Sequence, residues 1–210
     1  MKSDKIAVET YKYFSNLEGN QHIATEFALK IIAKIVKKYQ PKNILELGLG
    51  IGSISCVVLK FTQSKNQAIN YLGTEANYFC LMALPKYLKE HYNRLTIFNA
   101  LEDVVHSQQF DLIIIDGKDE NILRVKDIIS RHGIIIIEGD RMPQLNSIRT
   151  IFPNSFYTRV ISNYKNPNYG PFSATDYSGG LQLLFINPTF KQKLDYLFYK
   201  FQTAIRYKIR

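Results

Sequence analysis

Three glycines directly follow a short apolar run, in a spacing that could serve the binding of a small molecule. The segment Asn43–Leu47 is typical of a buried strand, and Gly48, Gly50 and Gly52 come immediately after it. Glycine lets the backbone turn tightly and approach a ligand closely, and a helix that begins behind such a loop offers unpaired N–H groups to it. The dinucleotide fingerprint is G-x-G-x-x-G or G-x-G-x-x-A. This loop instead reads E-x-G-x-G-x-G, with Glu46 two residues before the first glycine.

Polar residues follow the other predicted strands at the point where each one ends. Glu75, Asn99, Asp116 and the segment Glu138–Asp140 all stand in such positions. In a doubly wound sheet, ligands bind in the crevice at the carboxyl ends of the strands. We therefore expect these residues and the glycine loop to surround one site. For Glu75 there is a simpler alternative, because an acid near a helix start also stabilises the helix dipole.

The elements that must position these residues follow from the hydrophobic pattern. The first forty residues are predicted to be helical, and five short apolar runs then alternate with helix-like stretches. Runs of four apolar residues, such as Ile134–Ile137, indicate strands covered on both faces, and the alternation indicates a parallel, doubly wound α/β sheet. The predicted elements are strands at 43–47, 68–73, 95–98, 112–115, 134–137, 156–162 and 181–186, with helices at 52–61, 78–92, 101–107 and 121–131 and an amphipathic helix from Thr189.

The segment Glu46–Gly52 resembles the first motif of class I S-adenosylmethionine-dependent methyltransferases. Over residues 21–186, other positions are similar to that family too, and Phe110–Gly117 resembles the fourth-strand motif of its small-molecule O-methyltransferases. The resemblance implies a Rossmann-like, seven-stranded sheet of order 3-2-1-4-5-7-6 with an antiparallel last strand. It implies that Glu75 binds the ribose hydroxyls of the cofactor and that Ala100 and Leu101 contact its adenine. The other cofactor-binding residues that it implies are Glu46, Gly48, Gly50, Gly52 and Asp116.

The resemblance also implies candidates for catalysis. Asp116 stands where metal-dependent O-methyltransferases have a carboxylate ligand. Lys118 lies close to the position of their lysine base, but it is one residue nearer to the aspartate in sequence. The fifth strand departs from their pattern, because Glu138-Gly-Asp140 replaces an Asp-Asn pair. A divalent ion held by Asp116, Glu138 and Asp140 stays an alternative to metal-free catalysis, since hard cations accept any carboxylate oxygen. Metal-free catalysis is the reading that this departure favours.

The sequence therefore predicts transfer of a methyl group from S-adenosylmethionine to a small molecule, with an oxygen atom as the acceptor. An aminopropyltransferase of the spermidine-synthase type shares the glycine loop and the acid after the fourth strand, but it would begin with a β-hairpin domain. A non-catalytic binding protein that keeps the fold is the second alternative. The chain is expected to form one domain, with N-terminal helices over 1–40, a cofactor-binding core over 41–186 and a basic C-terminal helix over 187–210.

Residues 163–180 form a long connection between the last two predicted strands. Such connections in compact domains are usually lids or binding loops, and topology places this one over the cofactor cleft. Its aromatic residues could clasp an acceptor, or they could pack on the loop's own framework. These residues are Tyr164, Tyr169, Phe172 and Tyr177.

The net charge of +9 is concentrated in two segments, 30–42 and 191–210, which each carry +5. A basic amphipathic helix can pack on its own domain, which we favour here, or bind a membrane surface, a nucleic acid or another partner. A homo-oligomer is also compatible with the sequence. Two cysteines in no metal or disulfide spacing, and no apolar run of membrane-spanning length, indicate a cytoplasmic protein.

Overall fold

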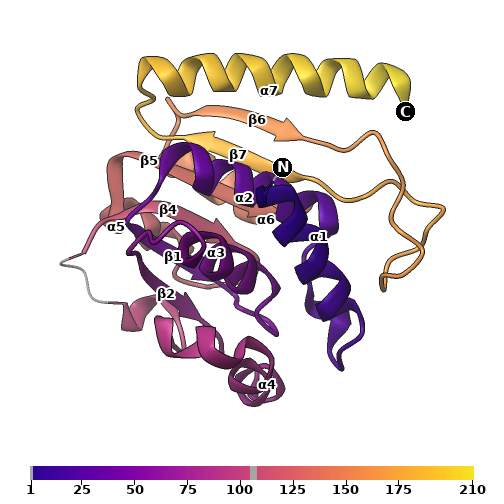
Figure 1. Cartoon of the computed structure of the whole chain (residues 1–210). Coiled ribbons are helices and arrows are strands. Elements are labelled where there is room, and N and C mark those ends of the chain that lie inside the picture. The colour runs from indigo at the N-terminus through magenta and orange to yellow at the C-terminus, as the bar shows by residue number, and fades with distance from the viewer. Residues whose placement is uncertain (1, 105–107) are drawn as a thin grey trace.

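The computed structural model describes residues 2–104 and 108–210. Its centre is one seven-stranded sheet with the order β3-β2-β1-β4-β5-β7-β6 (Figure 1). Neighbouring strands from β3 to β5 are parallel, and β7 runs antiparallel to both β5 and β6. The predicted fold class and strand order are therefore confirmed. The strands are β1 (Asn43–Leu47), β2 (Asn70–Thr74), β3 (Leu95–Phe98), β4 (Phe110–Ile115), β5 (Ile129–Glu138), β6 (Phe156–Val160) and β7 (Leu181–Phe185).

Successive residues of the central strands face opposite sides of the sheet, and each side is covered. Ile44, Leu112 and Ile134 belong to one buried cluster, whereas their chain neighbours Leu45, Ile113 and Ile135 belong to another. The first cluster includes residues of α1 (Lys2–Ser15), α2 (Glu26–Tyr39), α3 (Ser53–Gln63) and α4 (Tyr78–Leu88). The second includes residues of the short helices η3 (Leu101–Asp103), η4 (Ile122–Arg124) and α5 (Val125–Ile128), and of α6 (Met142–Ile151). Burial on both faces explains the continuous apolar runs.

Some predicted elements differ in the structure. The helix expected over 121–131 is shorter, because Ile129 already pairs with Phe110 of β4 and thereby begins β5. The helix expected over 101–107 is a single turn over Leu101–Asp103, and residues 105–107 lie outside the described part of the chain. Helix α6 was not predicted.

The N-terminal segment is helical, with α1, a turn η1 (Asn20–His22) and α2 before the first strand. Its described residues, 2–40, contain no strand, so they do not form the β-hairpin that an aminopropyltransferase would have. At the other end, α7 (Phe190–Ile209) lies along the edge strand β6 (Figure 1). Within the described residues, no helix combines the length and apolar character needed to cross a membrane.

Candidate functional site

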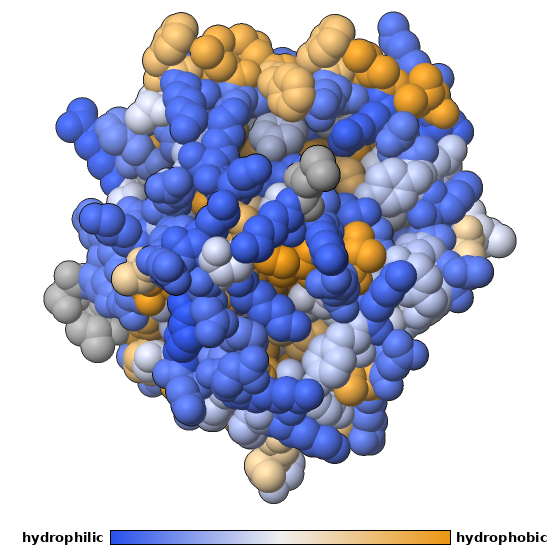
Figure 2. All heavy atoms as spheres, viewed as in Figure 1, coloured by the Kyte–Doolittle hydropathy of each residue, from blue (hydrophilic) through white to orange (hydrophobic). Residues whose placement is uncertain are grey.

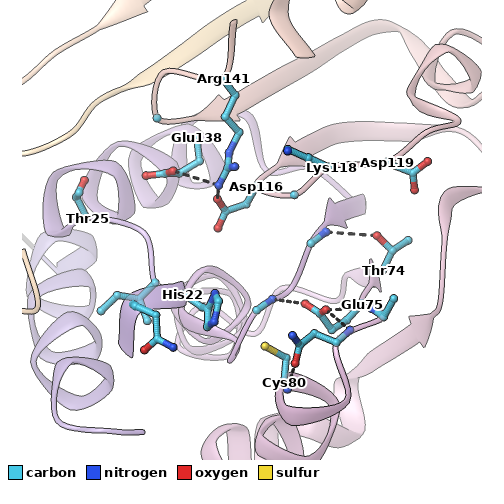
Figure 3. Close-up of a pocket in the computed structure, with 18 of the residues that line it drawn as sticks. His22, Thr25, Thr74, Glu75, Cys80, Asp116, Lys118, Asp119, Glu138 and Arg141 are labelled. Atoms are coloured by element: carbon cyan, nitrogen blue, oxygen red, sulfur yellow. Dashed lines mark hydrogen bonds and ion pairs between the residues drawn. The ribbon is translucent and has the colours of Figure 1, made fainter. Parts of the chain in front are cut away.

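A cavity of about 570 Å³ opens where β1, β2, β3, β4 and β5 end (Figure 3). Gly48 and Gly50 of the loop after β1 line it, together with Glu75 after β2, Asn99 after β3 and Asp116 after β4. This volume lies within the usual range for small-molecule sites. The predicted convergence of the strand ends is therefore present, although Gly52, Ala100 and Leu101 are not among the lining residues.

The glycine loop needs its glycines for the protein's own packing. All three of its glycines have positive φ values, which L side chains rarely adopt. A Cβ on Gly48 would lie 2.7 Å from the backbone of Gly117, and one on Gly50 would lie 2.8 Å from the carbonyl oxygen of His22. Gly52 begins α3 as its N-terminal cap. The loop is thus pressed between the segment after β4 and the N-terminal wall of the cavity.

Glu75 holds this loop in place. One of its carboxylate oxygens accepts the N–H of Gly50 at 2.7 Å, and the other accepts the N–H groups of Ala76 at 3.0 Å and Asn77 at 2.8 Å. A carboxylate has about four lone-pair sites, so a ligand hydroxyl can share these oxygens without displacing every backbone bond. The side chain is half-buried and lies at the cavity wall (Figure 3).

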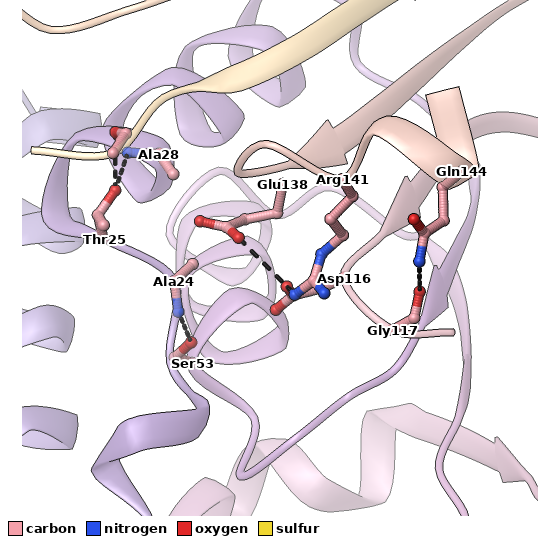
Figure 4. A network of polar contacts seen from close by, with 10 residues as sticks. Ala24, Thr25, Ala28, Ser53, Asp116, Gly117, Glu138, Arg141 and Gln144 are labelled. Atoms are coloured by element: carbon pink, nitrogen blue, oxygen red, sulfur yellow. Dashed lines mark hydrogen bonds and ion pairs between the residues drawn. The ribbon is translucent and has the colours of Figure 1, made fainter. Parts of the chain in front are cut away.

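Asp116, Glu138 and Arg141 form a charged cluster on the opposite wall (Figures 3 and 4). An Arg141 Nη atom lies 2.6 Å from a carboxylate oxygen of Asp116 and 3.9 Å from one of Glu138. The two carboxyl side chains are only 14% and 12% exposed. Burial raises the pKa of both carboxyl groups, and Arg141 opposes the rise at both. The charge of Asp116 raises the pKa of Glu138 further, whereas the hydrogen bond from Glu138 lowers the pKa of Asp116. Protons are therefore held here more tightly than by carboxyl groups in water.

The three candidate metal ligands do not fit a divalent cation. Arg141 already supplies the positive charge between Asp116 and Glu138, and Asp140 instead pairs with Arg159 at 2.8 Å, outside the cavity. Within the described residues, no group of three or more His, Cys, Asp or Glu side chains could hold an ion.

Lys118 and Asp119 line the cavity from the loop after β4. Asp119 accepts the backbone N–H groups of Leu101 and Asn121 at 2.9 and 2.8 Å, so it fixes this loop against η3. Leu101 itself is buried beneath the sheet, which explains why it does not reach the cavity. Asn99, two residues earlier, lines the cavity, whereas Ala100 and Leu101 do not.

Glu46 lies away from the cavity and is wholly buried. Its carboxylate accepts hydrogen bonds from the hydroxyl groups of Ser55, at 2.8 Å, and Tyr71. The expectation that Glu46 touches a cofactor is therefore not supported by its position. Its hydrogen bonds connect β1 to α3 and β2 inside the core, beside the glycine loop. Burial raises the pKa of Glu46 to about 8.

We expect the variant Glu46→Gln to have a flatter pH dependence of stability than the wild type. A carboxyl whose pKa is raised by folding contributes stability that is present below its ordinary pKa and is lost as the pH rises through the folded value. For Glu46 this loss runs from about pH 4.5 to about pH 8 and amounts to about 4–5 kcal/mol. Urea unfolding at pH 5 and pH 9 measures it, and equal declines in the two proteins would contradict this account.

The N-terminal segment and the loop 163–180 complete the cavity, and no motif in the sequence of the N-terminal segment indicates this position. Gln21, His22, Ile23 and Thr25 line it, as do Phe172 and Gly179 of the loop. The Thr25 hydroxyl donates to the Gly179 carbonyl at 2.9 Å and also caps α2, and the Ala24 N–H donates to Ser53 of α3 at 3.3 Å (Figure 4). These bonds join both segments to the core.

The loop itself is a hairpin-like extension, and its aromatic residues mostly pack on the protein. Its arms are bonded to each other between Lys165 and Tyr177. Tyr164 packs against Phe27, Tyr169 packs against Tyr11, and the Tyr177 hydroxyl donates to Arg210. Of the four aromatic residues expected near an acceptor, only Phe172 lines the cavity.

Comparison with known proteins supports the fold and nothing finer. No protein-family model matches the chain, and no curated protein matches it in sequence. Among solved structures, it is similar to the S-adenosylhomocysteine-bound methyltransferase PaMTH1 of Podospora anserina (14% identity, TM-score 0.54, 85% of this chain and 86% of that one). It is also similar to the O-methyltransferase TomG of Streptomyces achromogenes, involved in tomaymycin synthesis, in complex with S-adenosylmethionine (11% identity, TM-score 0.54, 89% and 90% coverage). A third match is an O-methyltransferase of Bacillus cereus in complex with S-adenosylhomocysteine (13% identity, TM-score 0.52, 88% and 91% coverage). The chain thus has the fold of S-adenosylmethionine-dependent methyltransferases.

Proposed function

We propose that this protein transfers a methyl group from S-adenosylmethionine to an oxygen atom of a small molecule. The observation that carries the proposal is the cavity at the strand ends, in which Glu75 and the glycine loop face the carboxyl cluster of Asp116 and Glu138. The matching structures named above include one in complex with S-adenosylmethionine and two with S-adenosylhomocysteine.

In this proposal, one group of cavity residues binds the nucleoside and a second faces the acceptor. Glu75 accepts hydrogen bonds from the ribose hydroxyls, and Asn99 and Asp119 lie beside the base. The backbone of Gly48 and Gly50 forms the floor. Asp116 stands where the methyl group would be transferred, so that its carboxylate can face the acceptor.

The sulfonium of S-adenosylmethionine supplies an activated methyl group when bound. During transfer the bond from sulfur to the methyl carbon breaks, a bond from that carbon to the acceptor oxygen forms, and the hydroxyl proton passes to a carboxylate. Asp116 is suited to receive this proton, because burial raises its pKa above the ordinary value of an aspartate and its side chain lines the cavity. General base catalysis of this kind contributes about 10²- to 10⁴-fold, and holding the acceptor in line contributes the rest.

Isothermal titration calorimetry with three nucleosides tests the class of reaction. We expect micromolar binding of S-adenosylmethionine and S-adenosylhomocysteine, and at least about tenfold weaker binding of decarboxylated S-adenosylmethionine, because its amino-acid carboxylate is missing. Tighter binding of the decarboxylated compound would favour an aminopropyltransferase. No binding of the first two compounds would contradict the proposal.

A further inference from the structure

Helix α7 packs on the domain through its polar face. Gln192, Asp195 and Thr203 are buried, and the neighbouring side chains on this face are tyrosines and Arg206. The Thr203 hydroxyl donates to the carbonyl of Arg159 at 2.7 Å, and Arg206 donates to the carbonyl of Ile161 at 2.7 Å. These carbonyls belong to the edge strand β6 and the residue after it, which have no further strand to pair with. The free carbonyl groups of a sheet edge need donors, and this explains why the polar face is turned inward.

The apolar face of α7 therefore points to solvent, whereas an amphipathic helix that packs on its own domain ordinarily buries this face. Figure 2, seen from the same side as Figure 1, shows hydrophobic side chains gathered along this helix. Phe190 is 77% exposed, Phe201 is 66% exposed and Ile209 is 59% exposed. Because a helix rises about 1.5 Å per residue, this stripe is about 28 Å long. We call it the α7 stripe, and it consists of Phe190, Leu194, Leu197, Phe198, Phe201, Ile205 and Ile209.

The charges around the α7 stripe are all positive. Lys193 and Lys200 lie along one side of it and Lys191 lies along the other, and Lys208 falls within it at helical spacing; all four are exposed. The one acidic residue of the helix, Asp195, faces inward, where it contacts Lys38 and Tyr39. The outward side of α7 thus combines a broad apolar surface with flanking ammonium groups and no carboxylate of its own.

This pattern discriminates among the surfaces that could cover the stripe. In a pair of α7 helices from two copies, whether parallel or antiparallel, lysines would face lysines, with no acid on the helix to pair with them. A nucleic acid would satisfy the lysines but would gain little from Phe and Leu side chains. An anionic lipid surface satisfies both, because lysines reach the headgroups while apolar side chains enter the boundary of the acyl chains.

We propose that α7 docks this protein onto a membrane surface rich in anionic lipid, with the α7 stripe inserted at the level of the headgroups. The helix would lie in the plane of the surface and keep its polar face on β6. Its C-terminal end lies next to the loop 163–180, since Tyr177 donates to the carbonyl of Arg210 at 2.8 Å. Phe172 of the same loop lines the candidate site, so docking would bring that loop close to the lipid. This inference stands independently of the proposed reaction.

Co-sedimentation with vesicles tests it. We expect the full chain to sediment with vesicles of phosphatidylcholine that contain about 30 mol% phosphatidylglycerol. Far less of it should sediment with vesicles of pure phosphatidylcholine. Binding should weaken in high salt. The double variant Leu197→Glu, Phe201→Glu should bind at least about 100-fold more weakly, and Lys193→Gln, Lys200→Gln about 10- to 30-fold more weakly.

The matched control is Leu123→Glu, because Leu123 is a similarly exposed leucine, 54% accessible, on η4. It should sediment as the wild type does. All variants should keep the wild-type melting temperature and S-adenosylhomocysteine affinity, which separates failure of this inference from failure of the proposed function.

Three results would overturn the inference. One is no binding of the wild type to anionic vesicles. A second is equal binding of the α7 double variant and the wild type. The third is evidence that a different partner covers the α7 stripe. Such evidence would be a dimer, seen by light scattering, that the double variant Leu197→Glu, Phe201→Glu dissociates, or binding of a single-stranded RNA oligonucleotide without binding of vesicles.

Discussion

Replacement of Glu75 by alanine is expected to weaken S-adenosylhomocysteine binding about 30- to 1000-fold. Two charge-assisted hydrogen bonds to the ribose hydroxyls would be lost, at about 1.5–3 kcal/mol each, and water would replace them in part. Titration calorimetry of the variant and the wild type measures the change directly. Equal affinities would mean that Glu75 is a framework residue only.

The same substitution is expected to lower the stability of the ligand-free protein by about 1–3 kcal/mol. The sequence alone predicts an unpaired carboxylate here, whose loss would hardly change the melting temperature. This prediction is wrong, because Glu75 accepts three backbone N–H groups in the structure, including that of Gly50.

A control variant separates the two effects. Asp111 also accepts two backbone N–H groups, from Lys42 at 2.9 Å and Asn43 at 3.1 Å, but it lies at the opposite end of the sheet. Asp111→Ala should therefore lower stability by a similar amount and leave S-adenosylhomocysteine affinity unchanged. If both variants lose affinity alike, the loss reflects general destabilisation.

Asp116→Asn should lower the rate of methyl transfer about 10²- to 10⁴-fold, because the amide cannot take the acceptor's proton. S-adenosylhomocysteine affinity should stay within about threefold, since the carboxylate acts on the acceptor in this proposal. The assay follows labelled methyl groups from S-adenosylmethionine onto an acceptor found by screening hydroxyl compounds.

Two further readouts accompany this variant. Asp140→Asn is the matched control, because Asp140 is exposed and pairs with Arg159 outside the cavity, and it should retain the wild-type rate. The wild-type rate should survive a chelator, because Arg141 occupies the position between the two carboxylates. An unchanged rate in Asp116→Asn, or a rate abolished by chelation, would contradict the assignment.

The sheet could be predicted because each of its central strands is recognisable from a few consecutive residues. Four-residue apolar runs such as Ile134–Ile137 fix strands buried on both faces, and the acids at their ends then share one edge. The position of Glu46 could also have been read from the sequence. Alternation along β1 places it on the same face as Ile44, beneath the following helix, and therefore away from the crevice.

Other features depend on contacts that no local pattern encodes. Arg141 contacts Asp116, which lies 25 residues earlier in the sequence, after the chain turns at Gly139 with a φ of 68°. The orientation of α7 depends on the free carbonyl groups of Arg159 and Ile161, which are distant in sequence. An apolar stripe predicts an amphipathic helix, but it does not indicate which face the domain will bind.

A crystal structure of the protein with S-adenosylhomocysteine would test the central claim most directly. We expect the nucleoside in the cavity at the strand ends, with both ribose hydroxyls within hydrogen-bond distance of Glu75 and its sulfur on the side of Asp116. A nucleoside bound elsewhere, or bound in the cavity without contact to Glu75, would contradict it.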